Sequence, residues 1–129
     1  MDKDTRSGAI LKLPSDWNQD EAPFMPVAQG DYTVVVLHAL QDDPDRVTVD
    51  FQIRGQSDCV GRHLFASYVL TTPVGKRLFK ELLNAVSIEP RQDSVGLAEL
   101  VGCTLRVTVR HNTRDEKVYA NVVQHRSSN

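Results

Sequence analysis

The sequence predicts a mainly β domain built from short strands and one helix. Strictly alternating apolar and polar residues recur in several short segments, whereas a three- and four-residue apolar period occurs only once. The length of 129 residues is enough for one hydrophobic core and leaves little for a second. We therefore expect a single domain in which strands dominate.

The composition is typical of a globular protein. Hydrophobic residues make up 40% of the chain and charged residues 25%, and no apolar run approaches the roughly 18–20 residues of a membrane span. The N-terminal sequence MDKDTRSG lacks the apolar stretch of a signal peptide, which predicts a cytoplasmic location and no contact with a membrane. The two cysteines, Cys59 and Cys103, are expected to be reduced thiols.

Residues 1–29 are predicted to form an extended N-terminal arm, and residues 30–126 the folded domain. The first thirty residues contain three of the six prolines and show no sustained period. We expect Trp17, Phe24 and Met25 to anchor the arm against the domain.

The first two strands are predicted over residues 32–40 and 46–54. YTVVVLHAL at 32–40 is rich in β-branched residues, and QDDPD at 41–45 has the composition of a turn. RVTVDFQIR at 46–54 alternates strictly, which indicates a strand with one buried and one solvated face. A loop over Gly55–Gly61 is expected to follow.

The third strand is predicted over residues 62–70, and the only long helix comes after it. Two phases compete in this strand, one placing Leu64, Tyr68 and Leu70 inward and the other Phe65 and Val69. The following segment repeats its apolar residues at helical spacing, with Thr71 or Thr72 as the N-cap and Pro73 in the first turn. The predicted stripe consists of Val74, Leu78, Phe79, Leu82, Leu83, Ala85 and Val86.

Two further strands are predicted near the C-terminus. A short helix at 94–101, ended by Gly102, is expected to precede a fourth strand that alternates from Cys103 to Arg110. HNTRDEK at 111–117 has the composition of a polar loop, and VYANVVQ at 118–124 is the fifth strand. The order β-β-β-α-β-β matches the five-stranded Greek-key barrel called the OB-fold. A small β-sandwich and an α+β sheet with the helix on one face are the alternatives.

The sequence contains none of the common catalytic motifs. GxGxxG, GxxxxGK[ST], HExxH and GxSxG are all missing, and the four histidines lie in four different segments. A zinc site from Cys59, His63, Cys103 and His111 is conceivable, but its spacing matches no zinc finger or ribbon. We therefore expect a non-catalytic protein without a metal or another cofactor.

Basic and aromatic residues gather on the expected solvent faces of the strands. Single-stranded nucleic acid requires guanidinium groups for its phosphates and aromatic rings on which bases stack. In OB-folds the second and third strands bind it, flanked by the loops after the first and fourth strands, here 41–45 and 111–117. The candidate binding residues are Arg46, Thr48, Arg54, Arg62, Phe65, Tyr68, Arg106, Arg110, Arg114 and Lys117. The alternative interpretation is an ordinary solvated sheet face, with Phe65 or Tyr68 in the core.

Several segments also resemble a known family. FMPVAQGDYTVVV at 24–36 is followed by VTVDFQI, GRHLFASYVL, VGKRLFKELLNAV, LAELVGCTLRVTV and KVYANVVQH. In this order they resemble a family of small phage proteins, catalogued as a domain of unknown function and associated with OB-fold single-stranded DNA-binding proteins. The resemblance covers roughly Ser15 to Arg126. It implies a single-stranded DNA-binding protein of phage replication or recombination in an infected bacterial host.

The resemblance is carried by positions of the scaffold. The most distinctive are Gly30–Asp31–Tyr32, Gly61–Arg62 and Leu100–Val101–Gly102. One departure concerns the C-terminus, because many single-strand binders end in an acidic tail that recruits other proteins and this sequence ends QHRSSN. Phage replication or recombination proteins are the expected partners, with a homo-oligomer as a further expectation.

The net charge of −2 is unevenly distributed along the chain. Residues 1–45 contain nine acids and three bases, a net charge of −6, whereas residues 46–129 contain eight acids and twelve bases, a net charge of +4. We therefore expect moderate, salt-sensitive binding to single-stranded DNA with little sequence preference. The rival hypothesis is an OB-like protein-interaction module whose basic face meets an acidic partner.

Overall fold

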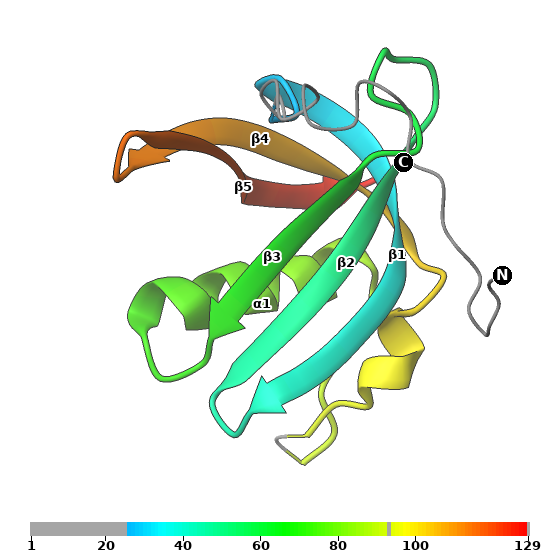
Figure 1. Cartoon of the computed structure of the whole chain (residues 1–129). Helices are drawn as coiled ribbons and strands as arrows, with labels where there is room; N and C mark the ends of the chain where they lie inside the picture. The colour runs from blue at the N-terminus through cyan, green and yellow to red at the C-terminus, as the bar shows by residue number, and fades with distance from the viewer. Residues whose placement is uncertain (1–25, 93, 129) are drawn as a thin grey trace, which may run out of the picture.

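A strongly curved five-stranded antiparallel sheet forms the body of the computed structural model, which describes residues 26–92 and 94–128 (Figure 1). Within these residues one α-helix and one short 3-10 helix accompany the sheet, and the order of the elements agrees with the sequence prediction. The elements are β1 (Gly30–Asp43), β2 (Arg46–Arg54), β3 (His63–Val69), α1 (Pro73–Ala85), η1 (Leu97–Leu100), β4 (Thr104–Arg114) and β5 (Lys117–Ser127). Within the described residues, no helix is long and apolar enough to cross a membrane.

The strand order is β3-β2-β1-β4-β5, so β3 and β5 are the two edges of the sheet. The predicted closed barrel is not formed, because no backbone ladder joins β3 to β5 in the part of the chain that is described. Instead α1 packs against both edge strands and fills the space beside the gap between them (Figure 1). Side chains rather than backbone hydrogen bonds therefore hold this side of the molecule together.

The alternation of β2 and β3 explains how the sheet encloses a core. Val47, Val49, Phe51 and Ile53 are all buried, as the pattern of β2 predicts. In β3 the buried residues are Leu64, Ala66 and Tyr68, which decides between the two phases that the sequence left open. Phe65 lies on the opposite face of the strand and is 65% exposed.

Helix α1 begins where the sequence predicts. The side chain of Thr72 accepts a hydrogen bond from the backbone N–H of Gly75 at 3.0 Å, and Pro73 occupies the first turn. The predicted stripe is wrong at Val74, which is exposed. In the first turn of α1, Gly75 lies against the carbonyl group of Val69, and Val74 is therefore on the outer side. Further along, the helix buries Phe79, Leu82, Leu83 and Ala85.

Both long hairpins are more regular than predicted. The loop expected at 41–45 is reduced to a turn at Pro44–Asp45, because β1 continues to Asp43. The loop expected at 111–117 is likewise wrong, since the β4–β5 ladder extends to the pair Arg114 and Lys117. Asp115 and Glu116 form its turn with φ angles of 54° and 66°. Positive φ at both central positions matches the right-handed twist of a hairpin, so the strands can continue to their ends.

The segments beside β1 and β4 complete the fold. The helix predicted at 94–101 is confined to the 3-10 turn η1, and Gly102 follows with a φ of +90°. Val27 is only 2% exposed, so the chain is already part of the core before β1 begins. The anchoring roles predicted for Trp17, Phe24 and Met25 fall outside the described residues.

Candidate nucleic-acid interface

A groove of about 1440 Å³ separates the start of β3 from the tip of the β4–β5 hairpin. Asp50 of β2 and residues 62–65 line one side, and Arg114 with residues 117–121 line the other. Figure 1 shows the β4–β5 hairpin extending away from the rest of the sheet. The groove therefore lies where the two unjoined edge strands diverge.

The β3 wall carries an aromatic platform. The rings of His63 and Phe65 are nearly parallel, at 12°, with centroids 5.9 Å apart. They lie on one face because alternate residues of a strand point the same way. The Nδ1 of His63 donates to Oδ1 of Asp50 at 2.7 Å, which fixes the orientation of the imidazole. The exposed Phe65 ring thus has a supported, defined position at the groove.

The hairpin wall pairs a cation with a second ring. The guanidinium carbon of Arg114 lies 5.6 Å from the centroid of the Tyr119 ring, within the range of a cation–π contact. These two residues are diagonal neighbours, because Arg114 pairs with Lys117 and Tyr119 with Asn112 across the ladder. Tyr119 is 43% exposed, so part of its surface remains accessible from the groove.

The segment that precedes β1 contributes a third side of the groove. Pro26 and Val27 line it, and the carbonyl oxygen of Val27 accepts a hydrogen bond from Nε2 of His111 at 2.8 Å. The backbone N–H of His111 also donates to Oε1 of Gln29 at 2.8 Å. These bonds attach the start of the described chain to β4 and fix the base of the hairpin.

Four of the ten sequence-predicted binding residues line this groove. They are Arg62, Phe65, Arg114 and Lys117. The prediction that Tyr68 binds nucleic acid is wrong. Tyr68 is 2% exposed, and the centroid of its ring lies 5.5 Å from that of Phe79 in the core, where no base can stack on it. The phase of β3 causes this, because Tyr68 and Phe65 are an odd number of residues apart and point to opposite faces.

The other predicted residues lie elsewhere on the sheet. The guanidinium of Arg46 forms an ion pair with Asp42 at 3.1 Å, and the hydroxyl of Thr48 donates to the same carboxylate at 3.1 Å. Arg54 is exposed at the end of β2. On β4, Arg106 is aligned with Arg126 and Arg110 with Asn121.

Three groove residues are not among the binding residues predicted from the sequence, namely His63, His111 and Tyr119. His63 could have been predicted, because it is two residues from Phe65 and alternate residues of a strand lie on the same face. The contributions of His111 and Tyr119 depend on the length of the β4–β5 ladder. The composition of HNTRDEK indicated a loop there instead.

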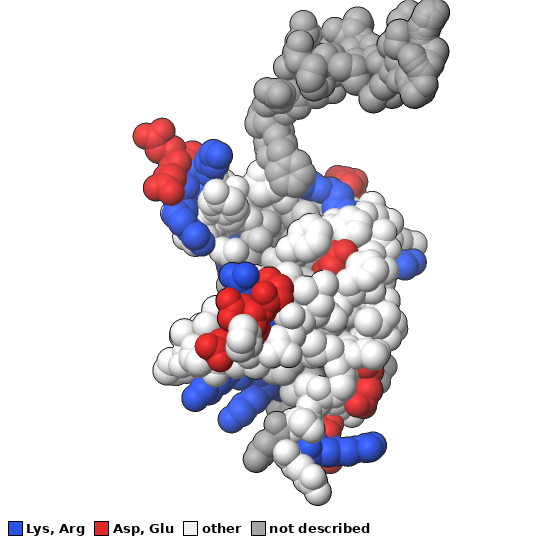
Figure 2. All heavy atoms as spheres, turned by 60° about the horizontal axis from the view of Figure 1, so that its bottom comes forward, with Lys and Arg blue, Asp and Glu red and all other residues white. Residues whose placement is uncertain are grey.

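Charged side chains are grouped rather than continuous on the surface. On the face that Figure 2 shows, Lys and Arg side chains form small clusters, several beside Asp or Glu, and no unbroken basic band. The hydrogen bond from Arg46 holds the pKa of Asp42 below its usual value, and that from Thr108 does the same for Asp31. Asp31 also pairs with Arg126 at 3.1 Å. Arg46 and Arg126 are therefore already partnered, whereas no ion pair within residues 26–92 and 94–128 involves Arg114 or Lys117.

The conceivable zinc site is not assembled in the described part of the chain, where no group of three or more histidine, cysteine or acidic side chains converges. His63 and His111 are engaged by Asp50 and Val27 respectively. The sulfur of Cys59 lies 3.9 Å from the hydroxyl of Tyr32, and Cys103 donates to the carbonyl oxygen of Glu99 at 3.4 Å.

Comparison with family models and with curated proteins found no match to this chain. The resemblance to the phage family therefore stays a prediction from the sequence.

Proposed function

We propose that the chain is a non-catalytic single-stranded DNA-binding protein that holds the strand in the groove between β3 and the β4–β5 hairpin. The supporting observation is that this groove combines exposed rings on both walls, Phe65 and Tyr119, with the cations of Arg114 and Lys117. Rings bind bases and cations bind phosphates, and a single strand presents both at once.

The groove favours a single strand over a duplex. Stacking on Phe65 or Tyr119 requires an open base face, which paired and stacked bases of a duplex do not present. These rings have no preferred base, since every base has a π face, and this supports binding with little sequence preference. Few cations line the described part of the groove, Arg114 and Lys117 among them, and this supports moderate affinity that weakens as salt rises.

The arrangement of the elements also supports this function. We infer an OB-fold that is open between β3 and β5, because the strand order and the position of α1 after β3 fit that topology. In OB-folds oligonucleotides lie across the second and third strands beside the loop after the fourth strand, and the groove occupies the same place. A phage-type role in replication or recombination is part of the proposal and rests on the sequence resemblance.

Fluorescence anisotropy of a labelled oligothymidine of about 30 nucleotides tests the proposal, with the matching duplex as competitor. Binding to the single strand should be preferred and should weaken as salt rises. The double variant Arg114→Gln/Lys117→Gln should reduce the log–log salt slope by about 1.4, since each phosphate contact on a single strand contributes about 0.7. No binding at low salt and about 50 µM protein would refute the proposal.

Two further variants locate the site. Phe65→Ala should weaken binding by about 1–3 kcal/mol and leave the salt slope unchanged, because it removes a stacking surface and no charge. Arg46→Gln is the matched control, since Arg46 is partnered by Asp42 and does not line the groove. An unchanged affinity for Phe65→Ala together with a loss for Arg46→Gln would place the site on another surface.

A further inference from the structure

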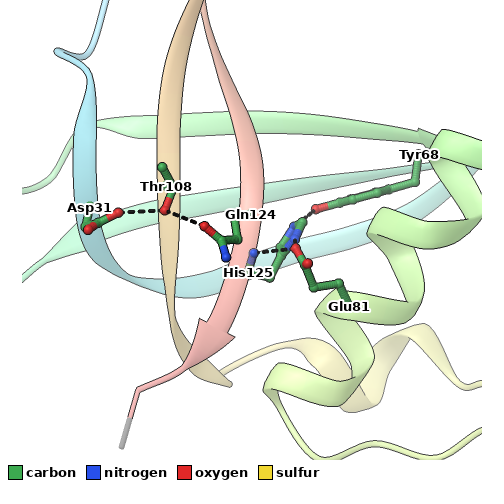
Figure 3. Close-up of polar contacts among 6 residues, drawn as sticks. All are labelled: Asp31, Tyr68, Glu81, Thr108, Gln124 and His125. Carbon is green, nitrogen blue, oxygen red and sulfur yellow. Dashed lines mark hydrogen bonds and ion pairs between the residues drawn. The ribbon is translucent and has the colours of Figure 1, made fainter.

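A polar network, buried at Tyr68 and His125 and partly exposed at Glu81, spans the gap between the two edge strands. The hydroxyl of Tyr68 on β3 lies 2.6 Å from Nε2 of His125 on β5. Oε1 of Glu81 on α1 accepts two hydrogen bonds from His125, from the backbone N–H at 2.6 Å and from Nδ1 at 3.0 Å. Figure 3 shows the three side chains converging from three different elements.

The direction of these hydrogen bonds follows from burial. Burial lowers the pKa of His125, despite the opposing effect of Glu81, and burial also raises the pKa of Tyr68. The imidazole is therefore neutral and the phenol protonated near pH 7. A carboxylate only accepts, so Nδ1 of His125 carries the proton, and Nε2 accepts the hydrogen of Tyr68. The donors and acceptors of the imidazole are then fully satisfied.

The network replaces the missing backbone ladder. The side chain of His125 is 0% exposed and Tyr68 is 2% exposed, with the rings of Phe51 and Phe79 as neighbours. Apolar side chains could fill this space, but they would accept a range of distances between β3 and β5. A hydrogen bond of 2.6 Å in a dry environment fixes that distance and the relative orientation of the strands.

The same two strands carry the walls of the groove. Tyr68 is three residues from Phe65 on β3, and His125 is six residues from Tyr119 on β5. Tyr68, His125 and Glu81 do not themselves line the groove. Tyr68 and His125 are connected to it only through the strands on which they lie. The strands are thus tied at their C-terminal ends and diverge toward their N-terminal ends, where the groove opens.

We propose that Tyr68, His125 and Glu81 are positioning residues that set the separation of the two groove walls. This inference rests on the proposed function, because the walls matter through the strand that they hold. It assigns a role to three residues that do not touch the DNA. Loss of the Tyr68–His125 hydrogen bond should widen or loosen the groove and weaken binding while the charges and rings stay in place.

The decisive variant is Tyr68→Phe, which removes one hydroxyl and keeps the ring in the core. The matched control is Thr108→Val, which removes a buried hydroxyl between strands that the backbone already joins, bonded at 2.6 Å to Asp31 (Figure 3). Tyr68→Phe should lower the affinity for oligothymidine about 2- to 30-fold, the range for network residues remote from a ligand, and Thr108→Val less than 2-fold. Equal losses in the two variants would overturn the inference.

A second measurement needs no DNA. Backbone amide exchange, followed by mass spectrometry, should accelerate in Tyr68→Phe at residues 63–66 and 117–122 relative to β1 and β2. Thr108→Val should not show this pattern. If wild type fails to bind single strands but the exchange pattern appears, the proposed function is wrong and the positioning of the walls is correct. If binding occurs and exchange in the walls is unchanged, the positioning inference is wrong.

Variants of Glu81 keep the test valid should Tyr68→Phe fold poorly. Glu81→Gln retains an oxygen that can accept from His125, whereas Glu81→Ala removes it. Glu81→Gln should restore most of the affinity that Glu81→Ala loses. The same loss in both variants would show that the geometry of the hydrogen bond is not what matters.

Discussion

The two sides of the sheet are held together in different ways. On the side of β1 and β4, a continuous antiparallel ladder fixes the strands, and the polar group of Asp31, Thr108 and Gln124 is added to it. On the side of β3 and β5, the hydrogen bonds of His125 take the place of a ladder. A polar side chain therefore has a greater structural role where the backbone pairing stops.

The largest expected effect is that of His125→Ala. The change leaves a cavity among Tyr68, Phe51 and Glu81 and removes the partner of a buried phenol. We expect a loss of about 3 kcal/mol in the free energy of unfolding, measured by urea denaturation followed by circular dichroism. A loss below about 1 kcal/mol would show that α1 alone holds β3 and β5 together.

Gly75→Ala should have the second largest effect. A Cβ at this position would collide with the backbone carbonyl of Val69, where the first turn of α1 packs on the end of β3. Relief requires α1 to shift, which we expect to cost about 1–3 kcal/mol in urea denaturation. Gly96→Ala is the control, because its Cβ would meet only the flexible side chain of Glu99. Equal stability of the two variants would contradict the close packing at Val69.

Thr108→Val tests the side that the backbone joins. The substitution preserves the shape of the side chain and removes the hydroxyl that donates to Asp31. We therefore expect a loss of about 1 kcal/mol or less in the free energy of unfolding. A loss as large as that of His125→Ala would remove the contrast between the two sides.

A change in pH should produce the smallest effect. Because burial lowers the pKa of His125 in the folded state, the unfolded chain binds more protons between that value and the ordinary value of 6.5. Stability should therefore fall as the pH drops from 7.5 to 5.5 and level off below the folded-state pKa. Thermal unfolding measures this, with His125→Gln expected to lose most of the dependence and His38→Gln to keep it. A rise in stability on acidification would show that His125 gains a proton on folding.

The elements of the fold could be predicted because their signals are local. The alternation of β2 and the Thr72–Pro73 start of α1 depend only on neighbouring residues, and the structure agrees with both. The length of β4 and β5 could not be predicted, because a polar composition describes a solvated hairpin arm as well as a loop. Closure of the barrel was also beyond local patterns, since it depends on how β3 and β5 meet across the molecule.

The candidate groove could be predicted only in part. Arg62 and Phe65 could be predicted from the positions of the second and third strands. The contact between Arg114 and Tyr119 can be predicted only when the β4–β5 register is known. The sequence left open which face Tyr68 occupies, because both phases of β3 are apolar, and Tyr68 therefore remained among the candidate binding residues. The tertiary partner that decides the phase, His125, is 57 residues away in the sequence.

The gap between the edge strands β3 and β5 has a consequence for the behaviour of the protein at high concentration. Strands at a sheet edge are templates for pairing with another chain, which is a route to aggregation. β3 has only seven residues, and β5 carries Lys117 near its start and Arg126 near its end. Short length and positive charge both oppose pairing between copies. Colloidal stability at this edge thus depends on residues that a closed barrel would not require, and it should decline in buffers that screen charge.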